Sequence, residues 1–433
     1  MNLKQHSDCK EWQFYGIPAF SSGTMSPLFA DCGTGLFPAE ETAEKSSFMH
    51  IFSGVLPEDI TAYASALSEA GFKKVFENKT NGNLFYQFAV PEGAFYVSLM
   101  KNDGTARFIL DRCKTAVPEN FGYTVYNETR SDTVLAQYSL HYDAMIRGVT
   151  CDCGMNYVFR LRDNSLIIID GGEFEQSTDL AVNDYMAFLR ELTGVQDGEK
   201  LRVSLWLCTH AHNDHCDFLS KILRFHADEI TVERAAFDFP SPENVRHSVS
   251  VAFAKQRLAE KFPDIKYIKL HAGHKFNIAN AELEILVSAE DAVGTVPDEP
   301  FPGTNDTSVL FTVKADGMTA LFLADCGDDN GAVLKNNYGE KELCCTFLQA
   351  AHHGINEIRA VYDKIKAEKV LLPQCRMNMD TRFDGIYANL CRLYGEQNIL
   401  FAHDKTDIFT LKDGSYSKTE RKHTGTAYDG SEW

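Results

Sequence analysis

The spacing of apolar positions predicts a small mixed unit in the first third of the chain. Apolar residues recur at helical spacing from Pro57 until Gly71, and beyond Gly71 they fall in short stretches that Asn-Gly and Asp-Gly turns separate. This pattern predicts one helix followed by strands at 74–76, 84–90, 95–99 and 107–110. Residues 1–45 are rich in Gly, Ser and Pro and show little periodicity, which is typical of loops. We expect an N-terminal α+β domain over residues 1–145.

Residues 146–433 show a different pattern, in which strand-like and helix-like stretches alternate. The stretches 157–161 and 165–170 predict a hairpin, and Ser177 is a suitable cap for a helix that ends before Gly194. The next predicted elements are a strand at 201–208, a helix after Asp217, a strand at 230–232, a helix at 244–262 and a strand at 266–270. Later strands, at 283–287, 308–313, 319–324 and 345–350, have a more hairpin-like spacing. The alternation predicts a layered α/β architecture, and the hairpins indicate mixed sheets.

Composition and charge narrow the classes of function. The 433 residues, 44% of them hydrophobic, are enough for two cores, and 42 basic against 61 acidic side chains give a net charge of −19. Such a charge repels nucleic acid phosphates and anionic membranes, so we expect a small-molecule substrate rather than a polynucleotide. No stretch approaches the roughly 20 apolar residues that cross a bilayer, and the start of the chain lacks the apolar core of a signal peptide. We expect a cytoplasmic protein in which the 12 scattered cysteines are reduced.

The strongest chemical signal is a group of histidines and an aspartate directly after an apolar strand. The strand runs from Leu205 to Thr209, and it is followed by His210, His212, Asp214 and His215. A strand end is rigid, and the loop beyond it can turn several side chains toward one point. Imidazoles suit zinc, and a nearby carboxylate lets a second divalent ion bind. Histidines this dense would repel one another when protonated unless a metal held the rings neutral.

This His-x-His-x-Asp-His pattern resembles the signature of the metallo-β-lactamase superfamily, and the resemblance covers about residues 150–412. It implies an αββα sandwich, that is, two mixed sheets flanked by helices. It also implies a binuclear site with His210, His212, Asp214 and His215 as ligands of two divalent ions, which we expect to be zinc, with manganese or iron as alternatives. Two further aspartates stand at strand ends as this superfamily requires. Asp170 would orient a ligand histidine, and Asp325 would bridge the two ions.

The last ligand should be a histidine, and the chain offers His352 and His353 side by side. Neighbouring side chains on an extended backbone point opposite ways, so we expect only one of the two rings to bind metal. We favour His353 as the ligand, which leaves His352 to contact the substrate. For the optional third histidine of the first site, His271 and His274 are candidates by position only.

Within the superfamily, the order of motifs resembles the hydrolase domain of bacterial competence proteins and phosphorylcholine esterases. The shared features are the stretch 305–310 before a strand, the segment around Asp325 and the His-His-Gly triplet. This resemblance implies hydrolysis of a small phosphodiester or another small ester. Metal-held water would attack, Asp214 would orient this nucleophile as a catalytic residue, and His352 would be the second catalytic residue.

Other functions use the same set of residues. A lactone or thioester hydrolase needs the same metals, and a nuclease is disfavoured by the charge of −19. A different class is a di-iron oxidoreductase, although relatives of that kind have Glu where His212 stands and carry a flavin domain. A non-catalytic binding protein is the third class. The N-terminal domain could serve substrate gating or dimerisation, which makes a homo-oligomer another expectation.

Overall fold

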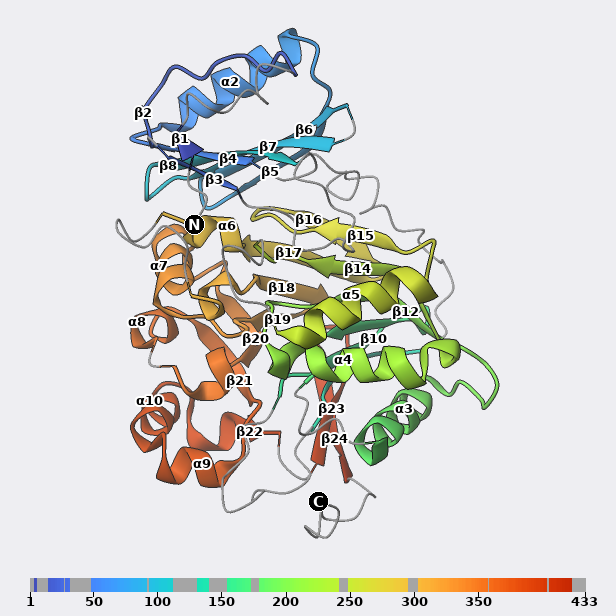
Figure 1. Ribbon diagram of the computed structural model, residues 1–433. Helices are drawn as coiled ribbons and strands as arrows, with labels where there is room; N and C mark the ends of the chain where they lie inside the picture. The colour runs from blue at the N-terminus through green and yellow to red at the C-terminus, as the bar shows by residue number, and fades with distance from the viewer. Residues whose placement is uncertain are drawn as a thin grey trace.

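The computed structural model describes residues 4–5, 15–26, 28–31, 48–91, 93–111, 131–139, 154–172, 179–240, 248–294, 303–356, 358–402 and 405–422. These residues form three sheets and the helices that cover them (Figure 1). One sheet makes up the N-terminal unit, and the other two are stacked beneath it in the view of Figure 1. Within the described part of the chain, no helix is both long and apolar enough to span a bilayer.

The N-terminal unit is one antiparallel sheet with a single helix across it. Its strands follow the order β1-β3-β4-β8-β7-β6-β5, with β2 paired to β4. Their bounds are β1 Lys4–Gln5, β2 Thr24–Met25, β3 Leu28–Asp31, β4 Phe48–Ser53, β5 Lys74–Thr80, β6 Asn83–Val90, β7 Gly93–Met100 and β8 Thr105–Asp111. Helix α2 (Pro57–Glu69) begins at the predicted proline and buries Ile60, Tyr63 and Leu67. The predicted helix and the four predicted strands are confirmed.

The second sheet follows the order β15-β14-β12-β11-β10-β9-β23-β24, with β13 beside β12. Its strands are β9 Thr133–Gln137, β10 Tyr157–Arg160, β11 Leu166–Ile169, β12 Leu201–Leu207, β13 Ile230–Val232, β14 Arg234–Phe237, β15 Lys266–Lys269, β23 Lys405–Lys412 and β24 Ser415–Lys422. The predicted hairpin is confirmed as β10 and β11, which pair antiparallel. The change from the N-terminal sheet to this one falls between β8 and β9, upstream of the boundary expected near residue 145.

The third sheet follows the order β16-β17-β18-β19-β20-β21-β22. Its strands are β16 Lys275–Ile278, β17 Ala281–Val287, β18 Leu310–Ala315, β19 Met318–Phe322, β20 Cys344–Gln349, β21 Lys366–Leu372 and β22 Ile399–Phe401. Strands β16 to β19 pair antiparallel in sequence order. The hairpin-like connection expected between the strands at 319–324 and 345–350 is wrong, because helix α7 (Asp328–Asn337) joins β19 to β20 and the two strands pair in parallel. From β19 to β22 the pairing is parallel, because a helical segment connects each strand to the next.

These two sheets pack face to face, and helices cover both outer faces. Alternate residues of a strand serve the two sides: on β12, Leu205 points into the core between the sheets, and Trp206 points toward the outer helices. The helices outside the second sheet are α3 Asp179–Thr193, α4 Asn213–Phe225 and α5 Val249–Lys261. Outside the third sheet lie α7 Asp328–Asn337, α8 Arg359–Tyr362, α9 Arg376–Thr381 and α10 Asp384–Tyr394. This arrangement confirms the predicted class, a sandwich of two mixed sheets flanked by helices.

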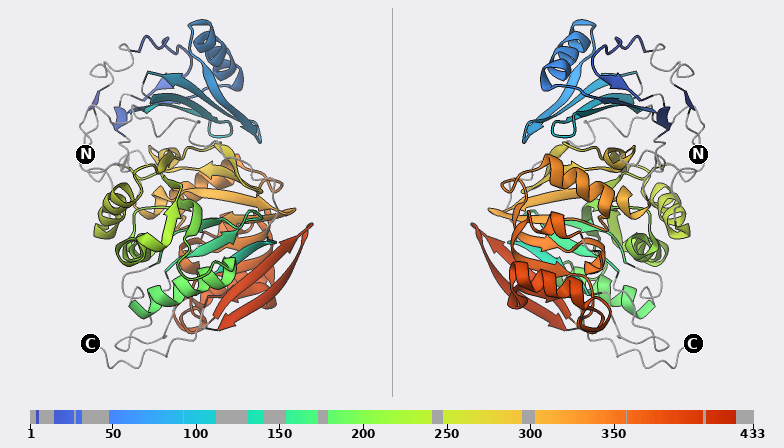
Figure 2. Two further views of the ribbon diagram at one scale, coloured as in Figure 1. Left: turned by 90° about the vertical axis from the view of Figure 1, so that its right-hand side faces the viewer. Right: turned by 90° about the vertical axis from the view of Figure 1, so that its left-hand side faces the viewer.

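The N-terminal unit lies at one end of the sandwich, and β23 and β24 lie near the other (Figure 2). The turn between β15 and β16 packs directly on the N-terminal sheet. Gly273 in this turn has φ +81°, and a Cβ there would lie 2.1 Å from Cγ of Phe85. The Asn78 side chain donates a hydrogen bond to the Gly273 carbonyl at 2.9 Å, and the Tyr96 hydroxyl donates one to the Ala272 carbonyl. At this turn the two units are in direct contact, and the contact depends on glycine.

Candidate metal centre

The predicted site residues come from the ends of four strands. Asp170 follows β11, His210 follows β12, Asp325 follows β19, and His353 follows β20. Strands β11 and β12 are parallel, as are β19 and β20. The carboxyl ends of parallel strands lie at one edge of their sheet, so each pair of strands delivers its two residues to the same place. The two sheets of the sandwich then bring the two pairs together.

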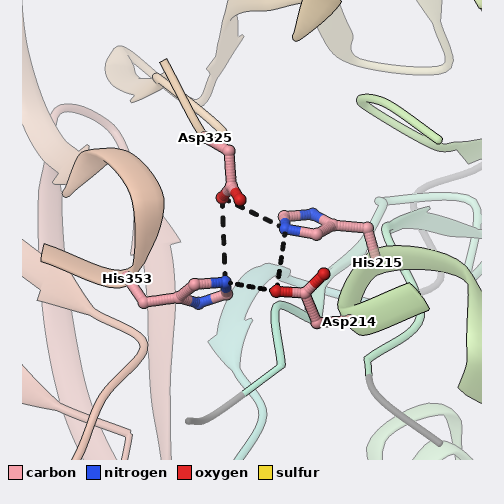
Figure 3. Close-up of side chains that lie close together, drawn as sticks. All are labelled: Asp214, His215, Asp325 and His353. Atoms are coloured by element: carbon pink, nitrogen blue, oxygen red, sulfur yellow. Dashed lines mark hydrogen bonds and ion pairs between the residues drawn. The ribbon is translucent and has the colours of Figure 1, made fainter. Parts of the chain in front are cut away.

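One group of ligand atoms consists of Asp214, His215, Asp325 and His353, which all lie within 4.8 Å of one another. Figure 3 shows the four side chains converging from both sheets. His353 Nε2 lies 3.0 Å from Asp214 Oδ2, and His215 Nε2 lies 3.1 Å from Asp325 Oδ1. His353 Nε2 is also 3.7 Å from Asp325 Oδ1. Two imidazole nitrogens and two carboxylates around one point are a plausible set for one divalent ion.

A second group consists of His210, His212 and Asp325. His210 Nε2 lies 3.1 Å from His212 Nδ1 and 3.5 Å from Asp325 Oδ2. Asp325 therefore belongs to both groups and presents a different oxygen to each. This is the arrangement expected of a carboxylate that bridges two cations.

Asp170 fixes the orientation of His215. Its Oδ2 lies 2.7 Å from His215 Nδ1, and its two oxygens accept hydrogen bonds from the backbone and the hydroxyl of Thr209 at 2.7 and 3.0 Å. Asp170 has φ +59° and is fully buried, so its side chain is held by several contacts at once. Because the carboxylate engages Nδ1, it leaves Nε2 of His215 directed at Asp325. A carboxylate behind a ligand histidine commonly fixes the tautomer in this way.

Helix α4 begins at Asn213, whereas the sequence indicated a helix only after Asp217. His212 is its N-cap residue, and Asp214 and His215 lie in its first turn. An aspartate is favourable there because the helix N-terminus carries partial positive charge. The Asp214 and His215 side chains are therefore positioned by a helix, whereas His210 and His212 lie on the preceding loop.

The prediction that His352 and His353 lie on an extended backbone is wrong. Their φ values are 46° and 54°, so both residues are in the left-handed region. In this turn both rings approach Asp325, with His352 Nε2 at 3.6 Å from Oδ2. His352 Nδ1 lies 2.9 Å from Asn356 Oδ1, which holds the ring in place. Gly354 continues the turn with φ +78°, and a Cβ there would lie 2.3 Å from a methyl carbon of Leu372.

His271 and His274, the candidates by position for a third histidine, have other partners. His271 Nε2 lies 2.7 Å from Asp111 Oδ2, and His274 Nε2 lies 3.1 Å from Gln87 Oε1. Both partners belong to the N-terminal sheet. The two histidines therefore serve the contact between the units, and neither belongs to the two groups of ligand atoms. Nothing in their local sequence distinguishes this role, because Asp111 and Gln87 are distant in the chain.

The charges at the site depend strongly on one another. Burial alone lowers the pKa of His215, but the carboxylates of Asp325, Asp170 and Asp214 raise it well above its ordinary value. Burial alone raises the pKa of Asp325, yet the neighbouring imidazoles, His215 first, bring it well below its ordinary range. The pKa of His210 is lowered by burial and by His215, so this ring is neutral at neutral pH. The two carboxylates at the centre are thus ionised and ready to bind a cation.

Several buried atoms at the centre lack hydrogen-bond partners. They are Nε2 of His215 and both carboxylate oxygens of Asp325. A buried polar atom without a partner costs about 1–3 kcal/mol, so three of them at one place require an explanation. These three atoms face the centre of the two groups, and each can coordinate a metal once the His215 ring has lost its Nε2 proton. The donor set of imidazoles and carboxylates fits zinc, manganese and iron.

The comparisons with known proteins find similarity among solved structures alone, since no family model and no curated protein matches the chain. The metallo-β-lactamase fold protein YhfI from Bacillus subtilis is 12% identical, with a TM-score of 0.37 over 63% of this chain and 96% of that chain. Zn²⁺-bound PqqB from Methylobacterium extorquens is 11% identical, with a TM-score of 0.36 over 63% and 98%. The diiron β-hydroxylase CmlA from Streptomyces venezuelae is 10% identical, with a TM-score of 0.32 over 68% and 55%. All three TM-scores are below 0.5, so the layers and the site are assigned from the strand pairing and contacts of this chain.

Proposed function

We propose that this chain is a metal-dependent hydrolase that holds two divalent ions at the candidate metal centre. The observation that supports the proposal best is the environment of Asp325. Its carboxylate is fully buried, neither oxygen has a hydrogen-bond partner, and each oxygen faces a different group of imidazoles. A carboxylate in that position needs positive charge on both sides. His210 and His212 would hold one ion with Asp325, and Asp214, His215 and His353 would hold the other.

Such ions, when bound, lower the pKa of coordinated water toward neutrality and polarise the oxygen of the bond under attack. The protein side chains then have separate tasks. Asp214 is 20% exposed, unlike the buried Asp325, so it can contact and orient the attacking water. His352 is 23% exposed and its Nε2 lies 3.6 Å from Asp325 Oδ2, where the ring can contact a bound substrate. Asp170 keeps His215 in one tautomer.

For the substrate we propose a small phosphodiester or another small ester. Support comes from the resemblance of the motif order and from the net charge of −19, which disfavours polynucleotides. The ions would be zinc in the first instance, because imidazole supplies four of the six ligands and suits zinc well.

Elemental analysis and kinetics of the purified protein test this proposal. We expect about two equivalents of divalent metal for each chain, and hydrolysis of chromogenic phosphodiesters in preference to lactones and thioesters. The His210→Ala and Asp214→Ala double variant should lose metal and activity together. His226→Ala is a matched control, because His226 is a histidine at the end of α4 that pairs with Glu229 at 2.7 Å, outside the centre.

The outcomes separate the classes of function. Wild-type protein that binds no stoichiometric metal contradicts the proposal as a whole. Metal with lactone or thioester hydrolysis retains the metallohydrolase and changes the substrate. Iron together with a redox activity points to an oxidoreductase instead.

A further inference from the structure

The segment from Asn305 to Val309 supplies no ligand, yet it contacts both loops that carry ligands. It lies between α6 (Ala289–Ala292) and β18 and includes a short 3-10 turn, Asn305–Thr307. Its residues are mostly polar, and Thr307 and Ser308 are fully buried. Buried polar residues in a connecting segment need specific partners, so their contacts indicate what the segment does.

The first contact joins the segment to the loop that carries His210 and His212. The backbone N–H of Val309 donates to the carbonyl of Thr209 at 3.0 Å. Thr209 immediately precedes His210 and also binds Asp170. The segment is thereby fixed to the end of β12.

The second set of contacts reaches the backbone around Asp325. The Ser308 hydroxyl oxygen accepts the backbone N–H of Asp325 at 3.2 Å. The side chain of Asn330 connects the same parts, because it donates to the Ser308 carbonyl at 3.3 Å and accepts the N–H of Gly327 at 3.0 Å. The short stretch from Asp325 to Gly327 is therefore held at both ends by groups that the segment supplies or contacts.

The third set of contacts caps α7, the helix that begins three residues after Asp325. One carboxylate oxygen of Asp306 accepts the backbone N–H groups of Asp329 and Asn330 at 3.0 and 3.2 Å. These N–H groups lie in the first turn, where a helix has no internal acceptors for them. A Cβ on Gly327 would lie 2.4 Å from Asp306 Oδ2, so the carboxylate approaches the backbone as closely as glycine permits. The cap comes from 23 residues away in the chain, which makes it a tertiary contact.

We infer that Asp306 and Ser308 are positioning residues that set the orientation of the bridging carboxylate of Asp325. This inference rests on the proposed function, since it concerns the affinity of the metal centre. The segment that caps α7 is also bound to Thr209, the residue before His210. It therefore fixes the distance between the Asp325 backbone and the loop after β12. Without the cap, α7 and the Asp325 loop can shift relative to His210 and His215, and both ions lose affinity.

Metal affinity measured by competition with a chromogenic chelator, with Zn²⁺ as the probe, tests the inference without reference to turnover. Asp306→Ala should weaken Zn²⁺ binding by about 10-fold or more, the effect typical of residues that support ligands. Asp306→Asn should restore most of the affinity, because asparagine retains an acceptor oxygen and caps helices about as well as aspartate. Ser308→Ala removes only the acceptor for the Asp325 N–H and should weaken binding in the same direction.

The matched control is Asp59→Ala, which removes the carboxylate that accepts the Leu56 N–H at the start of α2 in the N-terminal unit. It should lower the midpoint of thermal unfolding while Zn²⁺ affinity stays within twofold of wild type. Wild-type protein without Zn²⁺ binding would contradict the proposed function itself. Wild-type binding together with unchanged affinity in Ser308→Ala and in folded Asp306→Ala would overturn the positioning role alone. If Asp306→Ala does not fold, Ser308→Ala decides the question, and unchanged Zn²⁺ affinity in that variant overturns the positioning role.

Discussion

The described residues include two buried clusters of histidine and carboxylate, and the two clusters differ in the source of their positive charge. The first is the candidate metal centre. The second, here called the interface cluster, consists of Asp111, Lys269, His271 and Glu290. In it, Lys269 Nζ lies 2.9 Å from Asp111 and 3.2 Å from Glu290, and His271 lies 2.7 Å from Asp111 and 3.3 Å from Glu290. Each base thus contacts both acids.

The difference is the source of positive charge. The interface cluster includes the ammonium of Lys269 and an imidazole whose pKa burial alone would lower but Asp111 and Glu290 raise to about 10. Two cations and two anions therefore balance inside the protein. In the metal centre, the ion pairs that Asp214 and Asp325 make with other described residues are with histidines. A dense set of histidines and carboxylates indicates a metal site only where the chain provides no internal ammonium for them.

The largest expected difference follows from removing one carboxylate from each cluster. Asp325→Ala should reduce bound metal from about two equivalents to fewer than one and lower the rate of hydrolysis by about 10³-fold, roughly 4 kcal/mol. Asp111→Ala should leave metal content unchanged and lower the free energy of unfolding instead. The reason is that Lys269 and His271 lose one of the carboxylates that balance their positive charge. Elemental analysis and urea denaturation measure the two effects. Similar metal loss in both variants would show that the clusters do not differ as described.

The next expected effect concerns the internal cation. Lys269→Ala removes the ammonium that contacts the buried Asp111 and Glu290, and breaking a buried ion pair typically costs about 3–5 kcal/mol. We expect a loss of this order in the free energy of unfolding, measured by urea denaturation. Lys275→Ala is the control, since Lys275 pairs with Glu282 and Glu284 on partly exposed strands and should cost far less. A loss under about 1 kcal/mol in Lys269→Ala would mean that the ammonium is not needed to balance the cluster.

The clustering of the side chains at the candidate metal centre could be predicted from the sequence because much of the information is local. Four of the candidate ligands lie within six positions, and the apolar strand before them places them at the end of a strand. They are His210, His212, Asp214 and His215. Asp170 and Asp325 could be identified because each follows an apolar strand. The conformation at His352 and His353 could not, since it depends on a left-handed turn that packs against Leu372 on the neighbouring strand. The sequence did not predict the early start of α4, because the polar candidate ligands in its first turn interrupt the apolar spacing that is typical of a helix.

The interface cluster could not be predicted because its members are distant in sequence. Asp111 and His271 are 160 residues apart, and neither has a neighbour that suggests a partner. The same reason applies to β9, which pairs with β10 and β23 and so belongs to the sandwich despite preceding residue 145. Apolar spacing identifies elements, but it does not identify which edges meet. The helix and strands of the N-terminal unit were predictable, whereas their contact with Gly273 was not.

The smallest expected effect, taken for each pH unit, is a pH dependence of the interface cluster. The folded pKa of His271 is about 10, above the value of about 6.5 for an unfolded histidine. Its stabilising contribution is therefore fully present below about pH 6.5 and is lost as the pH rises toward 10, at up to about 1.4 kcal/mol for each pH unit. The groups that face it are Asp111, Glu290, Lys269, His274 and the ring of Tyr96. Urea denaturation between pH 6.5 and 10 should show a difference between wild type and His271→Gln that shrinks as the pH rises. His226→Gln, at a histidine outside the cluster, is measured in parallel as the control. A wild-type advantage over His271→Gln that stays constant or grows with pH would mean that the imidazole is not held in its charged form by the two carboxylates.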